Sequence, residues 1–149
     1  MKNSHKTLLF PGSFDPFTIG HKWIVDKALS LADRVVIAIG INENKRRLFP
    51  VEEVEQMVKR VYELNPNVEV VSYKGLTIDI ANEVGADAIV RGVRSTIDFE
   101  YEKAIADTNR ELSGIETILL FTHPAISHVS SSMVRELKHF GYDVTKYIP

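Results

Sequence analysis

The stretch FPGSFDPFTIGH, residues 10–21, joins a short apolar run to a helical pattern that has no acidic residue before Asp26. Its glycines and prolines are typical of a tight turn in which the backbone can approach a ligand closely. Such a turn between a strand and a helix puts His21 in the first helical turn, where free N–H groups and the helix dipole favour an anion. The stretch therefore predicts a strand–turn–helix unit that binds phosphate.

The same residues allow a simpler interpretation, in which the turn only caps a helix. Asp15 would then form an Asx-turn, and His21 would be an ordinary surface residue. The side chains of Phe14 and Phe17 are expected in the core rather than at a ligand. The stretch by itself leaves both interpretations open.

Short apolar runs alternate with helical patterns along the whole chain. The strand candidates are residues 7–10, 35–41, 68–71, 88–90 and 117–121. The helix candidates are residues 20–32, 51–64, 77–84, 99–112 and 131–140. Pro50 is placed to start the second helix, and Gly85 and Gly141 to end the third and fifth. This order predicts an α/β fold, a doubly wound, Rossmann-like sheet of five parallel strands with helices on both faces.

Composition limits the class of protein. A chain of 149 residues with 44% hydrophobic content predicts one domain, residues 1–149, with residues 1–6 as a flexible lead. A formal charge of -2 favours neither nucleic acid nor an anionic membrane as partner. The chain has no cysteine and no apolar stretch long enough to span a membrane, so we expect a cytoplasmic protein.

Cations follow the second and fourth predicted strands. The run Lys45–Arg47 comes after the second strand, within the irregular segment 42–49. Because the carboxyl ends of parallel strands share one edge of the sheet, this run is expected on the same edge as His21. A short basic run is also common in a solvated loop, so this interpretation stays open.

Arg91 and Arg94 flank Gly92 at the end of the fourth strand, in the predicted irregular segment 91–98. An arginine fork suits phosphate oxygens. Ion pairs with nearby acids are the alternative, which is more plausible for one arginine than for both. These acids are Asp98, Glu100 and Glu102.

The segment 122–130 and the serines after it open the last helix. Ser130 or Ser131 is a candidate N-cap. Since Met133, Val134 and Arg135 stand where a capping box needs Glu or Gln, the helix terminus stays electropositive. Together the four loops predict a site for a polyphosphate and a second phosphate. The histidines lack the spacing of metal ligands, and the Walker and dinucleotide fingerprints are missing from the sequence.

GSFDPFTIGH closely resembles the first motif of the nucleotidyltransferases that carry Thr/His-x-Gly-His, and VSSSMVRE resembles their second. With NENKRRLF and IVRGVRSTIDFEYE in the same order and spacing, the chain resembles the phosphopantetheine adenylyltransferase family over nearly its whole length. The resemblance implies AMP transfer from ATP to 4'-phosphopantetheine, with Mg²⁺ bound to ATP, in coenzyme A biosynthesis. It also implies a homohexamer, with dephospho-coenzyme A and coenzyme A as further small-molecule partners.

The resemblance also assigns site residues. Ser13 and Phe14 match ATP contacts, and His21 matches a residue that meets the ATP phosphates during transfer. Lys45 and Arg91 match the residues that hold the acceptor phosphate and complete the catalytic set with His21, while Thr77 lines the acceptor site beside Ser13. The other matches to nucleotide contacts are Gly92, Val93, Arg94, Glu102, Ile126, Ser127, His128, Val129, Ser130, Ser131 and Ser132.

Two further functions stay open at this point. Related nucleotidyltransferases adenylylate nicotinate mononucleotide or cytidylylate glycerol phosphate, and a non-catalytic nucleotide-binding module would keep the same phosphate sites. Arg91, Arg94 and the DFEYE context favour 4'-phosphopantetheine as acceptor. The sequence offers no convincing acid–base pair, which fits a phosphate acceptor because that group is already an anionic nucleophile near neutral pH.

Overall fold

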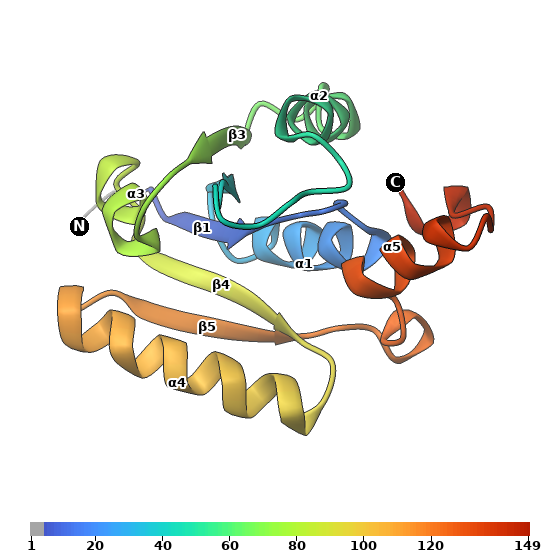
Figure 1. The fold of residues 1–149 in the computed structure, drawn as a ribbon. Helices are drawn as coiled ribbons and strands as arrows, with labels where there is room; N and C mark the ends of the chain where they lie inside the picture. The colour runs from blue at the N-terminus through green and yellow to red at the C-terminus, as the bar shows by residue number, and fades with distance from the viewer. Residues whose placement is uncertain (1–4) are drawn as a thin grey trace.

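The computed structural model describes residues 5–149 (Figure 1). The strands are β1 (Thr7–Gly12), β2 (Arg34–Gly40), β3 (Val68–Tyr73), β4 (Ala88–Val93) and β5 (Glu116–Phe121). The α-helices are α1 (Ile19–Leu29), α2 (Val51–Val61), α3 (Thr77–Glu83), α4 (Thr96–Ser113) and α5 (Ser131–His139). Two short 3₁₀ helices that the sequence did not predict are η1 (Pro124–Ile126) and η2 (Thr145–Tyr147).

The five strands form one parallel sheet in the order β3-β2-β1-β4-β5. From β1 the chain moves outward through β2 to β3, then returns to the other side of β1 for β4 and β5. The winding therefore reverses between β1 and β4, and an open α/β sheet binds ligands beside the carboxyl ends of the strands at this point. The predicted doubly wound sheet is confirmed.

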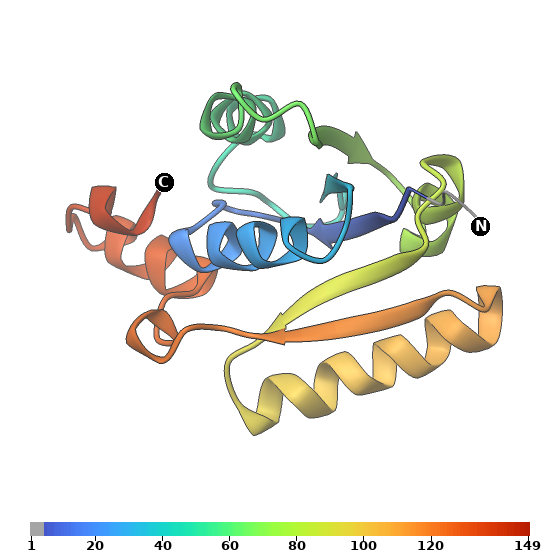
Figure 2. The same ribbon diagram turned by 180° about the vertical axis from the view of Figure 1, so that it is seen from behind.

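Helices cover both faces of the sheet. Residues of β1 alternate between the two faces, so Phe10 packs in a core with α1 and α2, whereas Leu9 packs in a second core with α3. Helix α4 lies beside β5 in both views of the ribbon (Figures 1 and 2). Helix α5 follows η1 and lies near the start of α1 (Figure 1).

The predicted element boundaries are close to those observed, with one informative difference. Helix α4 begins three residues before the predicted residue 99, because the Ser95 hydroxyl caps it by accepting a hydrogen bond from the Asp98 N–H at 3.3 Å. Arg91 is part of β4, so the predicted irregular segment 91–98 shrinks to Arg94 and Ser95.

The description of the chain begins just before β1. Residues 1–4 of the predicted flexible lead lie outside the described residues, and the Lys6 N–H donates to the Asp33 carboxylate at 2.7 Å. Within residues 5–149, the helices are too short or too polar to cross a membrane.

The turn between β1 and α1 is the meeting point of distant segments. Three of its backbone carbonyls, and that of Pro11 near the end of β1, accept hydrogen bonds from side chains of the β2–α2 loop, α5 and β4, which satisfies groups that a tight turn cannot pair with its own backbone. The pairs are Arg91 with Pro11, Arg47 with Phe14, Arg135 with Asp15, and Ser131 with Pro16.

Asp15 ties this turn to the β2–α2 loop. Its buried carboxylate accepts hydrogen bonds from the N–H groups of Leu48 at 3.1 Å and Phe49 at 2.7 Å. These partners are more than thirty residues away along the chain, so the Asx-turn interpretation of Asp15 is wrong.

Asp15→Asn is expected to lower the free energy of unfolding by about 1–3 kcal/mol, because an amide NH₂ would face one of the two N–H groups and leave it unpaired. Urea unfolding followed by circular dichroism measures the change. Glu111→Gln removes an exposed carboxylate on α4 that has no hydrogen-bond or ion-pair partner within residues 5–149, and it should leave the midpoint unchanged. Equal midpoints for Asp15→Asn and the wild type would contradict the anchoring role.

Candidate active site

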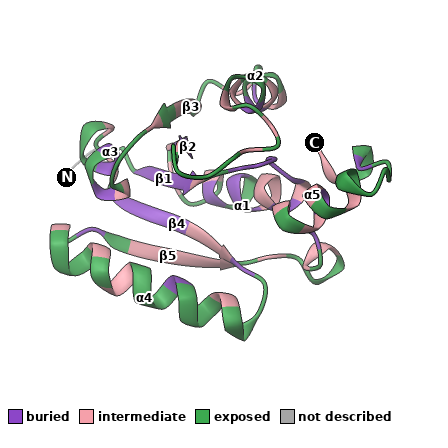
Figure 3. Ribbon diagram, in the orientation of Figure 1, coloured by how far each residue is buried: buried purple, intermediate pink, exposed green. Residues whose placement is uncertain are grey.

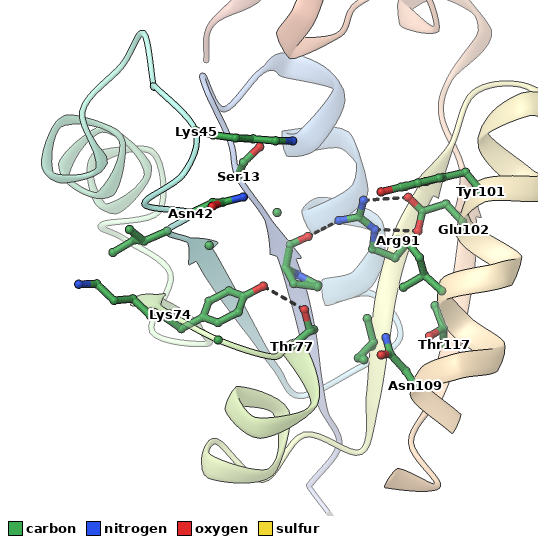
Figure 4. Close-up of a pocket in the computed structure, with 18 of the residues that line it drawn as sticks. Ser13, Asn42, Lys45, Lys74, Thr77, Arg91, Tyr101, Glu102, Asn109 and Thr117 are labelled. Atoms are coloured by element: carbon green, nitrogen blue, oxygen red, sulfur yellow. Dashed lines mark hydrogen bonds and ion pairs between the residues drawn. The ribbon is translucent and has the colours of Figure 1, made fainter. Parts of the chain in front are cut away.

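Two cavities open at the carboxyl edge of the sheet. The large cavity, of about 620 Å³, lies between the β1–α1 turn, the β2–α2 loop, the start of α3 and one side of α4 (Figure 4). The small cavity, of about 350 Å³, lies between the same turn and the starts of α1 and α5. Both volumes are in the range of small-molecule sites.

The two cavities share four lining residues, which we call the junction: Gly12, Ser13, Arg91 and Glu102. A ligand in one cavity can therefore approach a ligand in the other at this place. The lining of the large cavity includes every residue predicted to hold the acceptor: Ser13, Lys45, Thr77 and Arg91.

Most of the predicted nucleotide contacts line the small cavity. They are Ser13, Phe14, His21, Gly92, Arg94, Glu102, Val129, Ser130, Ser131 and Ser132. Four others line neither cavity: Val93, Ile126, Ser127 and His128. The Val93 side chain is buried, the Ser127 hydroxyl donates to the Pro124 carbonyl, and His128 is exposed. Their roles toward a nucleotide stay predictions.

His21 is the third residue of α1 and is only partly exposed, in the small cavity. The Thr18 N–H donates to its Nδ1 at 2.9 Å, and the Thr18 hydroxyl in turn accepts from the His21 N–H. Because Nδ1 accepts this bond, the proton of the neutral ring is on Nε2, which remains a donor. The interpretation of His21 as an ordinary surface residue is therefore wrong, although Thr18 does cap the helix.

The environment of His21 keeps its imidazole neutral. Burial of the ring lowers its pKa from 6.5 to about 3, with smaller effects from the charges of Arg91 and Arg94. The rings of Phe14 and Phe17 lie 4.9 Å and 5.4 Å from the imidazole, centroid to centroid. His21 can thus donate a hydrogen bond to phosphate without exchanging a proton near neutral pH.

Phe14 is held in an uncommon backbone conformation. Its φ is +47°, which costs a residue with a side chain about 1–2 kcal/mol. The buried ring and the hydrogen bond from Arg47 to the Phe14 carbonyl hold this geometry. A Cβ atom on Gly12 would lie 2.9 Å from the Phe14 ring, so glycine is needed there. Burial confirms Phe14 and Phe17 as core residues.

Both arginines of β4 and its following loop are paired. Arg91 binds both carboxylate oxygens of Glu102 at 2.9 Å and 2.8 Å, and Arg94 binds Asp98 at 3.0 Å (Figure 4 shows the Arg91 pair). From the sequence, ion pairs with nearby acids were more plausible for one of these two arginines than for both, and this expectation is wrong. The early start of α4 explains this, because it brings Asp98 into the helix, on the same face as Glu102 and one turn before it.

Two residues of the basic run Lys45–Arg47, which follows β2, have different surroundings. Lys45 lies at the large cavity opposite Arg91, and its ammonium has no hydrogen-bond or ion-pair partner within residues 5–149 (Figure 4). Arg47 instead donates to the carbonyls of Phe14 and Phe49, so its guanidinium supports the turn. Lys45 is the side chain of this run that can meet a bound anion.

The structure also brings residues to the cavities that the sequence did not indicate. The Tyr73 hydroxyl lies 3.0 Å from that of Thr77 on the wall of the large cavity. Thr117 lies across from it, and its buried hydroxyl has no hydrogen-bond partner among residues 5–149 (Figure 4). Arg135 lines the small cavity and donates to the Asp15 carbonyl. The sequence could have indicated this position for Arg135, because residues three apart in a helix share one face and Ser132 was already a predicted site residue.

The start of α5 gives the small cavity hydroxyl groups and a positive charge. Ser130 is the N-cap and accepts from the Met133 N–H at 3.0 Å, which confirms one of the two predicted caps. Ser131 donates to the Pro16 carbonyl at 2.7 Å, so α5 is fixed to the β1–α1 turn. An anion in the small cavity would meet Arg94, Arg135, His21 and the α5 terminus.

His21 should make the protein sensitive to acid. Below pH 6.5 the unfolded chain binds a proton at this ring that the folded protein does not bind until about pH 3. The free energy of unfolding should therefore fall as the pH drops from 6.5 toward 3, with no contribution from His21 above that window. His21→Gln removes the group that titrates. Between pH 7 and pH 5 the free energy of unfolding of the wild type should therefore fall by up to about 2 kcal/mol more than that of the variant. Urea unfolding at both pH values is the measurement, and equal losses would show that the folded ring titrates normally.

Comparisons with known proteins identify the family of this chain. The model of the cytidylyltransferase-like family matches residues 9–137. Phosphopantetheine adenylyltransferase of Bacteroides thetaiotaomicron is 55% identical over 141 residues, which are 95% of this chain and 93% of the relative. That of Flavobacterium psychrophilum is 48% identical over the same shares of both chains.

Solved structures support the fold. The bifunctional NMN adenylyltransferase/ADP ribose pyrophosphatase of Francisella tularensis, complexed with AMP and Mn ion, superposes on 97% of this chain and 44% of its own, with a TM-score of 0.72 and 17% identity. At that identity the likeness concerns the fold alone. The sequence relatives carry the closer assignment: this chain belongs to the phosphopantetheine adenylyltransferases, within the cytidylyltransferase-like family.

Proposed function

We propose that the chain transfers AMP from ATP to 4'-phosphopantetheine, giving dephospho-coenzyme A and pyrophosphate. The observation that carries this proposal is the junction, where a cavity rich in cations and hydroxyls meets a larger cavity with its own cation, Lys45, which has no ion-pair partner in the described part of the chain. Transfer between two bound molecules requires two adjoining sites of this kind. The names of the relatives, which cover nearly all of this chain, supply the identity of the acceptor.

The chemistry needs no base from the protein. An oxygen of the acceptor phosphate attacks the α-phosphorus of ATP, a new P–O bond forms, and the bond from that phosphorus to the bridging oxygen of pyrophosphate breaks. No proton has to move, because the attacking oxygen is already anionic near neutral pH. The protein contributes alignment of the two phosphates and stabilisation of charge on the α-phosphate and the leaving group.

Each cation has a position suited to one side of the transfer. Lys45 and Arg91 would hold the acceptor phosphate at the large cavity, with Ser13 between the two substrates. The Nε2–H of His21 would donate to phosphate oxygens whose charge grows during transfer. A donor that interacts more strongly in the transition state than in the ground state raises kcat.

We propose that Mg²⁺ reaches the site bound to ATP rather than in a protein cage. Asp98 and Glu102, which line the small cavity, are both paired with arginines. Within residues 5–149, His, Asp and Glu side chains form no cluster of three that could hold a metal. Mg²⁺ would therefore be held mainly by the phosphates of ATP, whose charge it neutralises.

The proposed assembly is a homohexamer, and the proposed location is the cytoplasm, where ATP is available. Most of helix α4 is exposed in the isolated chain (Figure 3). It supports self-association because four of its large apolar side chains are exposed: Ile97, Phe99, Tyr101 and Leu112. Light scattering should give six times the mass of the chain, and a monomer at all concentrations would contradict the proposal. Fractionation of cells tests the location.

Purified protein with ATP, Mg²⁺ and 4'-phosphopantetheine is expected to form dephospho-coenzyme A and pyrophosphate in equal amounts, and chelation of Mg²⁺ should stop the reaction. Coupled pyrophosphate detection and mass spectrometry measure the two products. Nicotinate mononucleotide with ATP and glycerol phosphate with CTP are the matched control pairs and should give background. Turnover with either control pair but none with 4'-phosphopantetheine would refute the proposed acceptor, and nucleotide binding without any turnover would indicate a non-catalytic module.

A further inference from the structure

The large cavity has more room than the acceptor phosphate needs. Its volume is about 620 Å³, and Lys45 and Arg91 would hold the phosphate in one part of it. Part of the remaining wall is apolar, with Ile41, Ile89 and Ile105 among the residues that line it. An apolar wall with a few placed polar groups is typical of a site for the organic part of a ligand. The rest of the acceptor is therefore expected to lie here, beside its phosphate.

Two of the three cations that line the large cavity are paired. Arg91 binds Glu102 at 2.8 Å, and Lys74 binds Glu43 at 2.6 Å. Lys45 is the one cation of this lining without an ion-pair partner in the described part of the chain. Since Lys45 and the remaining donors of Arg91 would serve the phosphate, little positive charge is left for a second anionic group. The organic part of the acceptor is therefore expected to be uncharged.

A pair of hydroxyl groups lies on the wall of this cavity. The Tyr73 hydroxyl oxygen is 3.0 Å from that of Thr77, and either group can be the donor (Figure 4). Two hydroxyls have two protons and four lone pairs, and their shared bond uses one of each. The pair therefore keeps one donor and three acceptor positions, for which the structure shows no other partner among residues 5–149.

The packing of the tyrosine fixes the position of this pair. Tyr73 is the last residue of β3, and its half-buried ring packs against the second core. Gly40 is its partner in β2, where an added Cβ atom would lie 3.4 Å from the tyrosine oxygen, so glycine leaves space for the hydroxyl. Thr77 is the first residue of α3. The sheet therefore places one hydroxyl of the pair, and α3 places the other.

We propose that the Tyr73 hydroxyl, together with that of Thr77, binds an amide group in the chain of the acceptor and so helps to select 4'-phosphopantetheine. This proposal rests on the proposed function, because it names a contact of the same acceptor. The acceptor is a phosphate ester whose uncharged chain contains two amides, and an amide has both an N–H donor and a C=O acceptor. The hydroxyl pair can bind either group, whereas glycerol phosphate has no amide.

Tyr73→Phe removes the hydroxyl and keeps the ring. We expect KM for 4'-phosphopantetheine to rise about three- to tenfold, as the loss of one neutral hydrogen bond does. The value of kcat and the dissociation constant of ATP should stay within about twofold, because the reacting phosphates keep their alignment. Tyr142→Phe makes the same change at an exposed position outside both cavities and should leave all three values unaltered. An unchanged KM in folded Tyr73→Phe would overturn the proposal.

A ligand without amides tests the chemistry of the contact. Neopentyl phosphate keeps the phosphate and a branched carbon close to it, so we expect it to compete with 4'-phosphopantetheine. Its inhibition constant should be the same in the wild type and in Tyr73→Phe, because it has no group for the hydroxyl to bind. If Tyr73→Phe weakened both ligands by the same factor, the hydroxyl would act on the phosphate, and the amide contact would be refuted.

A double variant tests whether the two hydroxyls act together. Thr77→Val and Tyr73→Phe combined should raise KM for 4'-phosphopantetheine by less than the product of their separate effects, because each change alone already breaks the shared bond. Effects that multiply in full would contradict the joint role of the pair.

A thermal melt without substrates separates binding from a purely structural role. Tyr73→Phe should melt close to the wild type. If the pair only closed the turn between β3 and α3, the variant would melt at a lower temperature and keep the normal KM, and this result would also overturn the proposal. Turnover by the wild type tests the proposed function by itself, whereas the ratios between variants and wild type test Tyr73.

Discussion

The requirement that buried backbone carbonyls find donors shapes the whole site. The turn after β1 cannot pair its own carbonyls, so donors come from the β2–α2 loop and from α5, while β4 supplies a donor to the Pro11 carbonyl near the end of β1. Three of the four donors are arginines, namely Arg47, Arg91 and Arg135. The bonds that close the turn therefore also gather positive charge around it, so folding and anion binding depend on the same side chains.

This arrangement explains why the site needs few groups that titrate near neutral pH. His21 stays neutral because burial and the neighbouring arginines lower its pKa, and the capping bond from Thr18 fixes its ring. Arg91 is balanced by Glu102, and Arg94 by Asp98. A site of fixed donors and paired charges suits a transfer in which placing two phosphates is the main task.

Much of this could be predicted from the sequence, because apolar runs, glycines and prolines report local structure directly. The turn, the five strand–helix units and the Ser130 cap all follow from such signals. The pairing of both arginines could not be predicted, since it depends on the true start of α4 at Thr96 and on which face of that helix meets β4. The partners of Asp15 lie more than thirty residues away, which no local pattern reports.

A crystal structure of the ternary complex tests the central claim most directly, that the reacting phosphates meet where the two cavities join. The complex would contain 4'-phosphopantetheine and an ATP analogue with a methylene group in place of the α,β-bridging oxygen. We predict an acceptor phosphate oxygen about 3–3.5 Å from the α-phosphorus, beside Ser13 and Arg91 and in line with the leaving group. An acceptor phosphate bound away from the junction, or a nucleotide whose α-phosphate lies outside the small cavity, would contradict the account.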